Sequence, residues 1–156
     1  MKRSLLMRNI AFGLLFTLIG FSYSFRIPSK KGNHSLSVNV ESLRNSEGHV
    51  MFVLYNTQDA LPDKELNKYF KKNRGAITEG SSTATFHQLV PGEYAVSIFH
   101  DENNDGEIEK GLFLPKEGLG FSNFQSISPT NKPSFDKASF KLTEDTTIQV
   151  KMIYFK

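Results

Sequence analysis

Short apolar segments patterned like β-strands recur along most of the chain, and this feature constrains the fold most strongly. Residues 35–41 alternate apolar and polar side chains, a period of two that is typical of a half-buried strand. Residues 50–55 form an unbroken run of apolar β-formers, which indicates a central strand. Residues 146–154 alternate again near the end of the chain. This spacing predicts strands rather than long helices.

Two further strand-like segments, residues 82–88 and 93–100, flank a Pro-Gly pair. Adjacent proline and glycine mark a turn, so the two segments are expected to form a β-hairpin. Apolar matching selects the face of each strand that points to the core. The side chains expected on that face are Ala84, Phe86, Val96 and Ile98.

One segment, residues 59–74, breaks the strand pattern. Leu66, Tyr69 and Phe70 fall at helical spacing, and Gly75 can end the helix in a left-handed conformation. We therefore expect one short helix that crosses between strands. Its lysines are explained either as a solvated helix face or as a docking surface for an acidic partner.

Shorter strand-like segments at residues 121–126 and 137–142 bring the expected total to about seven strands, with one crossover helix and no internal repeat. Many short strands with few helices are typical of a sandwich of two sheets. The fold class expected from the pattern is therefore all-β.

The first 24 residues have the layout of a secretory signal. A short positive segment precedes an uncharged apolar run at residues 10–21, and Ser22 and Ser24 are small residues suited to a cleavage site. The alternative is an uncleaved membrane anchor, but a spanning helix needs about 20 apolar residues. We expect a signal peptide at residues 1–24, a flexible leader at 25–34 and a single domain at 35–156. No stable membrane insertion is then expected after cleavage.

Composition excludes several functions. The chain has no cysteine, which excludes disulfides, cysteine-ligated zinc, iron–sulfur clusters and a thiol nucleophile. Its net charge is +3, and removal of the predicted signal takes away three basic residues and no acidic ones. The mature chain would then have no net charge, so no basic field is expected to attract nucleic acid.

The acidic loop that begins at Asp101 is the main chemical signal in the chain. Its pattern, D-x-N-x-D-G-x-I-E, places side-chain oxygens at alternate positions and a glycine, Gly106, where a tight reversal is needed. Calcium binds 6–8 such oxygens, carboxylates and backbone carbonyls included. The predicted ligands of a Ca²⁺ ion are Asp101, Asn103, Asp105, Glu107 and Glu109.

The loop is not an EF-hand. Leu112 stands where an EF-hand has its bidentate glutamate, and strand and loop flank the segment instead of two helices. A bound cation would need a further ligand, for which Glu117 is the nearest candidate. The alternative explanation is a solvated turn, since Asn, Asp and Gly favour tight turns.

Searches for catalytic motifs find little. The segment that starts at Gly120 begins like G-x-S-x-G but ends in phenylalanine, and the four histidines have no zinc-binding spacing. His100 beside Asp101 and Glu102 could act in acid–base catalysis. The favoured alternative is that it ends a strand and hydrogen-bonds to its loop.

Several segments together resemble the bacterial family known as domain of unknown function 2141. They are Leu89–Val96, Phe99–Gly106, Pro115–Gly118, Gly120–Asn123 and Pro133–Ala138. Besides the predicted ion ligands, the residues that carry the resemblance are His100, Glu102, Gly106, Pro115, Glu117, Gly120, Ser122 and Asn123.

The resemblance implies an exported bacterial protein with an immunoglobulin-like or transthyretin-like β-sandwich. It implies no activity. We therefore expect a non-enzymatic binding or structural module of the bacterial envelope, periplasmic or extracellular, with an envelope or extracellular ligand. The acidic loop and residues 115–123 would form its binding edge. The alternative is a hydrolase-type enzyme that uses His100 and Glu117 as acid–base groups.

Overall fold

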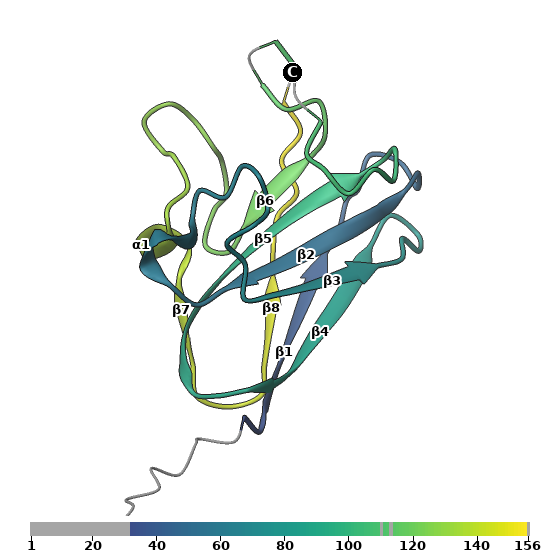
Figure 1. Cartoon of the computed structure of the whole chain (residues 1–156). Coiled ribbons are helices and arrows are strands. Elements are labelled where there is room, and N and C mark those ends of the chain that lie inside the picture. Colours follow the sequence, from purple (N-terminus) through teal and green to yellow (C-terminus); the bar gives the residue numbers. More distant parts are fainter. Residues whose placement is uncertain (1–31, 110, 113, 156) are drawn as a thin grey trace, which may run out of the picture.

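Two β-sheets pack against each other in the computed structural model, which describes residues 32–109, 111–112 and 114–155 (Figure 1). The predicted signal peptide and residues 25–31 of the predicted leader lie outside the described residues. Among the residues that are described, no helix is long and apolar enough to cross a membrane.

The smaller sheet has three strands in the order β4-β1-β8. β1 (His34–Val40) lies at its centre, antiparallel to β4 (Ser82–Leu89) and parallel to β8 (Thr146–Gln149). Val38 lies opposite Ala84 in the antiparallel pair. The alternation in β1 places every second side chain in the interior, as the sequence pattern predicts.

The larger sheet has the order β3-β2-β5-β6, with β7 also paired to β5. Its strands are β3 (Lys71–Gly75), β2 (His49–Tyr55), β5 (Gly92–Asp101), β6 (Leu119–Phe121) and β7 (Phe140–Leu142). All these pairs are antiparallel. β7 lies beside the start of β5 and β6 beside its middle, so the two short strands share one edge.

Both faces of the larger sheet are covered, and all seven residues of β2 are consequently buried. On the inner face, Phe52 and Leu54 join apolar side chains of β1 and β4 in the interior of the sandwich. The outer face carries a second apolar cluster, which loops, a 3₁₀ turn (η1, Gln58–Ala60) and a one-turn helix (α1, Phe135–Ala138) cover. The unbroken apolar run of β2 thus correctly predicted a central strand.

The predicted hairpin around Pro91-Gly92 is wrong. β4 and β5 belong to different sheets, and the segment between them crosses from one sheet to the other. The four side chains predicted on the core face do lie in the interior cluster. They meet across the interior of the sandwich instead of within one sheet, because alternation reveals a buried face but not the partner strand.

The predicted crossover helix at residues 59–74 is also wrong. The segment contains the end of η1, an irregular stretch in which Leu66 has a φ of 49°, and most of β3. Pairing of β3 with β2 overrides the helical spacing. Lys72 and Arg74 point to solvent from this edge strand, where charged side chains discourage pairing with other chains.

The structure confirms an all-β sandwich of two sheets. The part of the chain that is described has eight strands. The strand predicted at residues 121–126 is wrong apart from Phe121, because β6 ends at that residue, while β7 is shorter than its predicted segment and β8 ends before residue 154. The immunoglobulin-like or transthyretin-like topology stays a prediction.

Candidate functional site

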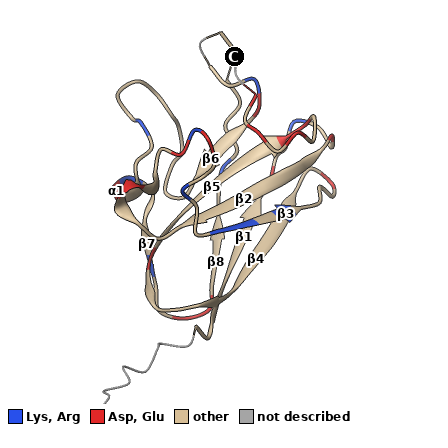
Figure 2. Ribbon diagram, in the orientation of Figure 1, with Lys and Arg blue, Asp and Glu red and all other residues tan. Residues whose placement is uncertain are grey.

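The acidic loop follows β5, at an end of the sandwich where Asp and Glu residues gather (Figure 2). Asp101 is fully buried at the end of β5. Its Oδ1 accepts a hydrogen bond from the backbone N–H of Asp105 (3.1 Å), and its Oδ2 accepts one from that of Gly106 (3.0 Å). His49 Nε2 lies 3.1 Å from Oδ2 as an ion-pair contact, without hydrogen-bond geometry. Asp101 therefore fixes the reversal of the loop.

The side-chain oxygens of Asn103 and Asp105 bind the loop's own donors. Asn103 Oδ1 accepts from the N–H of Asp105 at 3.0 Å, and Asp105 Oδ1 accepts from that of Glu107 at 2.8 Å. Asn103 Nδ2 donates to Asp105 Oδ2 at 2.8 Å. Glu107 is exposed, and Glu109 pairs with Lys116. Asn103 and Asp105 thus form a compact turn in which their side-chain oxygens already accept hydrogen bonds.

Glu117 holds both ends of the acidic loop. Its side chain is buried, with Oε1 accepting from the N–H of Glu102 and Oε2 from that of Glu109, both at 3.0 Å. Burial raises the pKa of Glu117 above its usual value, although these two hydrogen bonds act in the opposite direction. Its position in sequence suggested an ion ligand, whereas its contacts are those of a brace.

His100 is likewise engaged within the fold. Its Nε2 lies 2.9 Å from the carbonyl of Glu47, and its Nδ1 lies 2.8 Å from the hydroxyl of Tyr154. A carbonyl can only accept, so we assign the proton to Nε2 and let Nδ1 accept from the tyrosine. Glu102 lies beside this pair, where Arg44 Nη2 approaches its Oε1 at 2.6 Å. His100 is fully buried near the end of β5, but its hydrogen-bond partners lie before β2 and near the C-terminus instead of in the acidic loop that follows it.

The segment that resembles G-x-S-x-G joins β6 to its neighbours. Ser122 Oγ donates to the carbonyl of Ala138 and accepts from the N–H of Val96 at 2.9 Å. Asn123 Nδ2 donates to the carbonyl of Ser139 at 2.8 Å. A side chain at Gly120 would meet the carbonyl of Lys151 at 2.4 Å, so the close approach there requires glycine.

These positions bear directly on the predicted ion site. Within the described ranges, no three His, Cys, Asp or Glu residues come together in a way that could hold a metal ion. Asp101, Asn103 and Asp105 do share one turn, but their oxygens face N–H donors. The Ca²⁺ site therefore stays a prediction.

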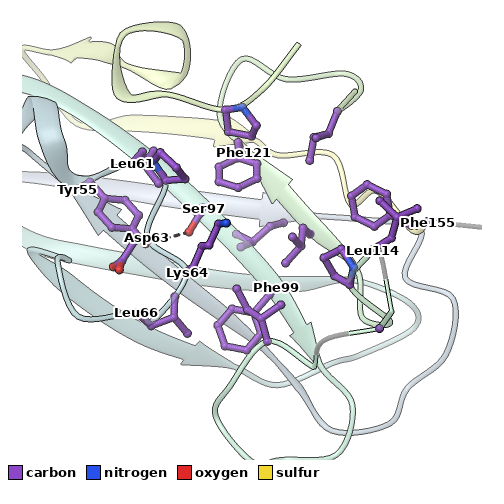
Figure 3. Close-up of a pocket in the computed structure, with 18 residues that line it drawn as sticks. Tyr55, Leu61, Asp63, Lys64, Leu66, Ser97, Phe99, Leu114, Phe121 and Phe155 are labelled. Carbon is purple, nitrogen blue, oxygen red and sulfur yellow. Dashed lines mark hydrogen bonds between the residues drawn. The ribbon is translucent and has the colours of Figure 1, made fainter. Parts of the chain in front are cut away.

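A different feature, a pocket of about 460 Å³, lies on the outer face of the larger sheet (Figure 3). Its floor is formed by strand residues, among them Tyr55 of β2 and Ser97 and Phe99 of β5. Its walls come from loops distant in sequence. The wall residues include Leu61, Pro62, Asp63, Lys64, Leu66, Ile108, Leu114, Pro115, Ile127, Pro133 and Phe155.

Few polar groups interrupt this apolar lining. The hydroxyl of Tyr55 lies 3.4 Å from Ser97 Oγ on the floor, and burial raises the pKa of Tyr55, so the phenol is neutral. Asp63 is buried, and its carboxylate accepts from the N–H groups of Asn67 (3.1 Å) and Lys68 (2.9 Å). A small-molecule site typically combines about 300–1,000 Å³ of apolar space with a few polar groups, and this pocket fits that description.

Sequence reasoning missed most of the pocket residues, although Pro115, one of its candidate residues, lines the pocket. One signal was available, because β5 places Ala95, Ser97 and Phe99 on the face opposite its core residues, and two of these are apolar. A strand that is apolar on both faces needs a second cover. Its lone polar member, Ser97, marks the floor of the pocket.

A second hollow of about 370 Å³ adjoins the pocket and is polar. It shares Lys64, Leu66 and Ile108 with the pocket and is also lined by Lys72 and by Asp105 of the acidic loop. The acidic loop therefore contributes to the surroundings of the apolar pocket through Ile108.

Comparison with known proteins places the chain in a family. The model of a family described as an uncharacterized protein conserved in bacteria, DUF2141, matches residues 38–150. The chain belongs to the DUF2141 family. The match runs from within β1 to the end of β8 and includes the acidic loop and most of the pocket. No curated protein and no solved structure matches the chain.

Proposed function

We propose that this DUF2141 protein is an exported, non-enzymatic binding module of the bacterial envelope that holds a small apolar ligand in the pocket on its larger sheet. The observation that carries the proposal is the pocket itself, with about 460 Å³ of apolar space on a floor of rigid strands. The acidic loop and residues 115–123, the expected binding edge, contribute Ile108, Pro115 and Phe121 to its lining. The layout of residues 1–24 supports export to the periplasm or the medium.

Binding of a fluorescent apolar dye, N-phenyl-1-naphthylamine, tests this function. The dye should gain fluorescence on saturable binding to the purified protein, and Ser97→Phe should abolish the gain by filling the pocket from its floor. Leu112→Ser is the matched control, because Leu112 is 96% exposed and does not line the pocket. Thermal melting verifies that both variants are folded. Equal dye binding by Ser97→Phe and the parent protein would contradict the proposal.

The alternative, a hydrolase that uses His100 and Glu117, has weaker support. Both nitrogens of His100 and both carboxylate oxygens of Glu117 are engaged with groups of the fold. Both side chains are buried, so a substrate would have to displace these contacts. The geometry favours binding over hydrolysis.

The calcium-braced loop is a separate part of the proposal. Five carboxylates lie in the nine residues from Asp101 to Glu109, and a cation would relieve their mutual repulsion. Titration with CaCl₂ tests this expectation, because an ion that binds the folded state raises the melting temperature. MgCl₂ at equal ionic strength is the control. An unchanged melting temperature at millimolar Ca²⁺ would exclude a stabilising site.

A further inference from the structure

We propose that the ligand of the pocket is a single-chain amphipathic carboxylate of the fatty-acid class. The carboxylate would lie beside the amine of Lys64, and the hydrocarbon chain would lie along the apolar part of the pocket. This inference rests on the proposed binding function and specifies the chemistry of its ligand.

The polar groups of the pocket lie at one end. In Figure 3, Tyr55, Asp63, Lys64 and Ser97 lie toward one side of the pocket, and Leu114 and Phe155 lie toward the other. A ligand that matches this layout has one polar end and one apolar end. An apolar ligand without a polar group would leave the hydroxyls of the floor without a new partner.

Among the lining residues within the described ranges, Lys64 is the one that carries a positive charge. Figure 3 shows its side chain extending into the pocket, and its amine has no ion-pair or hydrogen-bond partner among the residues that the structure describes. The other charged group in the lining, Asp63, already accepts two backbone N–H groups. The lysine can therefore pair with an anion from the ligand, while the carboxylate of Asp63 has its own donors.

The charged side chains of the described lining favour a monoanion over a dianion. Lys64 is the one cation among the lining residues that the structure describes, and the buried carboxylate of Asp63 would repel a dianionic group such as a phosphate monoester more strongly than a monoanion. A carboxylate carries one negative charge and has two oxygens, which could bind the Lys64 amine and a hydroxyl of the floor, such as that of Ser97. A cationic amphipath would bring its charge close to Lys64.

Three amphipaths of equal chain length test the inference: decanoate, decanol and decylamine. Each is titrated at about pH 8 and low salt against the full purified protein, with displacement of N-phenyl-1-naphthylamine as the measurement. Decanoate should bind about tenfold more tightly than decanol, a ratio expected for one charge-assisted contact, and decylamine should bind most weakly. Lys64→Met should remove the preference for decanoate. Lys68→Met, a change at an exposed lysine outside the lining, should keep it.

The outcomes separate the ligand class from the binding function. If decanol or decylamine binds as tightly as decanoate, or if Lys64→Met keeps the preference, the carboxylate class is wrong and the binding function stands. If none of the three displaces the dye or binds by calorimetry, both proposals are wrong. A preference for decanoate that only Lys64→Met removes supports both.

Discussion

The two faces of the larger sheet use the same strands in different ways. On the inner face, Phe52, Leu54 and Val96 pack against a second sheet, and regular strands supply both sides of the contact. On the outer face, Met51, Val53 and Phe99 pack against loops, η1 and α1. The pocket of about 460 Å³ lies on the outer face.

This difference has a simple physical origin. Two sheets interdigitate side chains at regular spacing, so their interface can reach the density of a protein core. The outer cover comes from irregular segments whose side chains have no common period. The backbone N–H groups of these segments need local hydrogen-bond acceptors, which the carboxylates of Asp63 and Glu117 provide. A pocket can therefore persist beneath this cover, and the strands of the larger sheet form its floor.

The largest expected effect is a loss of stability from a substitution on the inner face of the larger sheet. Phe52→Ala removes a fully buried ring between the sheets and should lower the free energy of unfolding by about 3–5 kcal/mol. Urea denaturation measures the change. A loss below about 1 kcal/mol would show that the interior is less densely packed than described.

Phe99→Ala makes the same substitution on the outer face. Phe99 is as buried as an interior residue, but it lines an existing pocket, so the variant enlarges this space instead of opening a new cavity. We expect a loss of about 3 kcal/mol or less, together with weaker dye binding. A loss greater than that of Phe52→Ala, measured in the same urea series, would contradict the distinction between the faces.

Glu117→Ala loosens the outer cover and leaves the inner face unchanged. It removes the acceptor for the N–H groups of Glu102 and Glu109, at an expected loss of about 1–3 kcal/mol. Hydrogen exchange should accelerate at these two amides, with little change at the amides of β1. Unchanged protection at both amides would show that Glu117 does not hold the loop.

The smallest expected effect is the pH dependence of the stabilisation that Glu117 contributes. Burial raises the pKa of Glu117 above its usual value of 4.5, so the folded protein binds this proton more tightly than the unfolded chain does. The stabilisation from Glu117 is therefore complete below pH 4.5 and declines as the pH rises through the raised pKa. The loss caused by Glu117→Ala should be largest at acid pH and shrink toward neutral pH. Urea denaturation of both proteins across this range checks the trend, and a loss that grows with pH would contradict it.

The sequence predicted features that depend on local pattern. Alternation in β1 and the unbroken apolar run of β2 identified both strands, and the run of β2 indicated a central strand. Where the outcome depended on distant partners, prediction failed. Nothing in the residues around Pro91 shows that β4 and β5 join different sheets, and the spacing of Leu66, Tyr69 and Phe70 gives no sign that β3 pairs with β2.

The same limit applies to the sites. The turn that begins at Asp101 follows from its own Asn, Asp and Gly residues and could be predicted. The pairing of Glu117 with both ends of that loop depends on the path of the chain between them. The pocket draws on strands and on several loops, and no single segment carries its pattern.

Amide chemical-shift mapping with decanoate tests the central claim most directly, because it shows where a ligand lies. The account predicts saturable shifts at Tyr55, Ser97, Phe99 and Phe121, with little change at inner-strand residues such as Val38. Shifts confined to other surfaces, or no shifts at millimolar decanoate, would contradict the claim that the outer face of the larger sheet is the binding site.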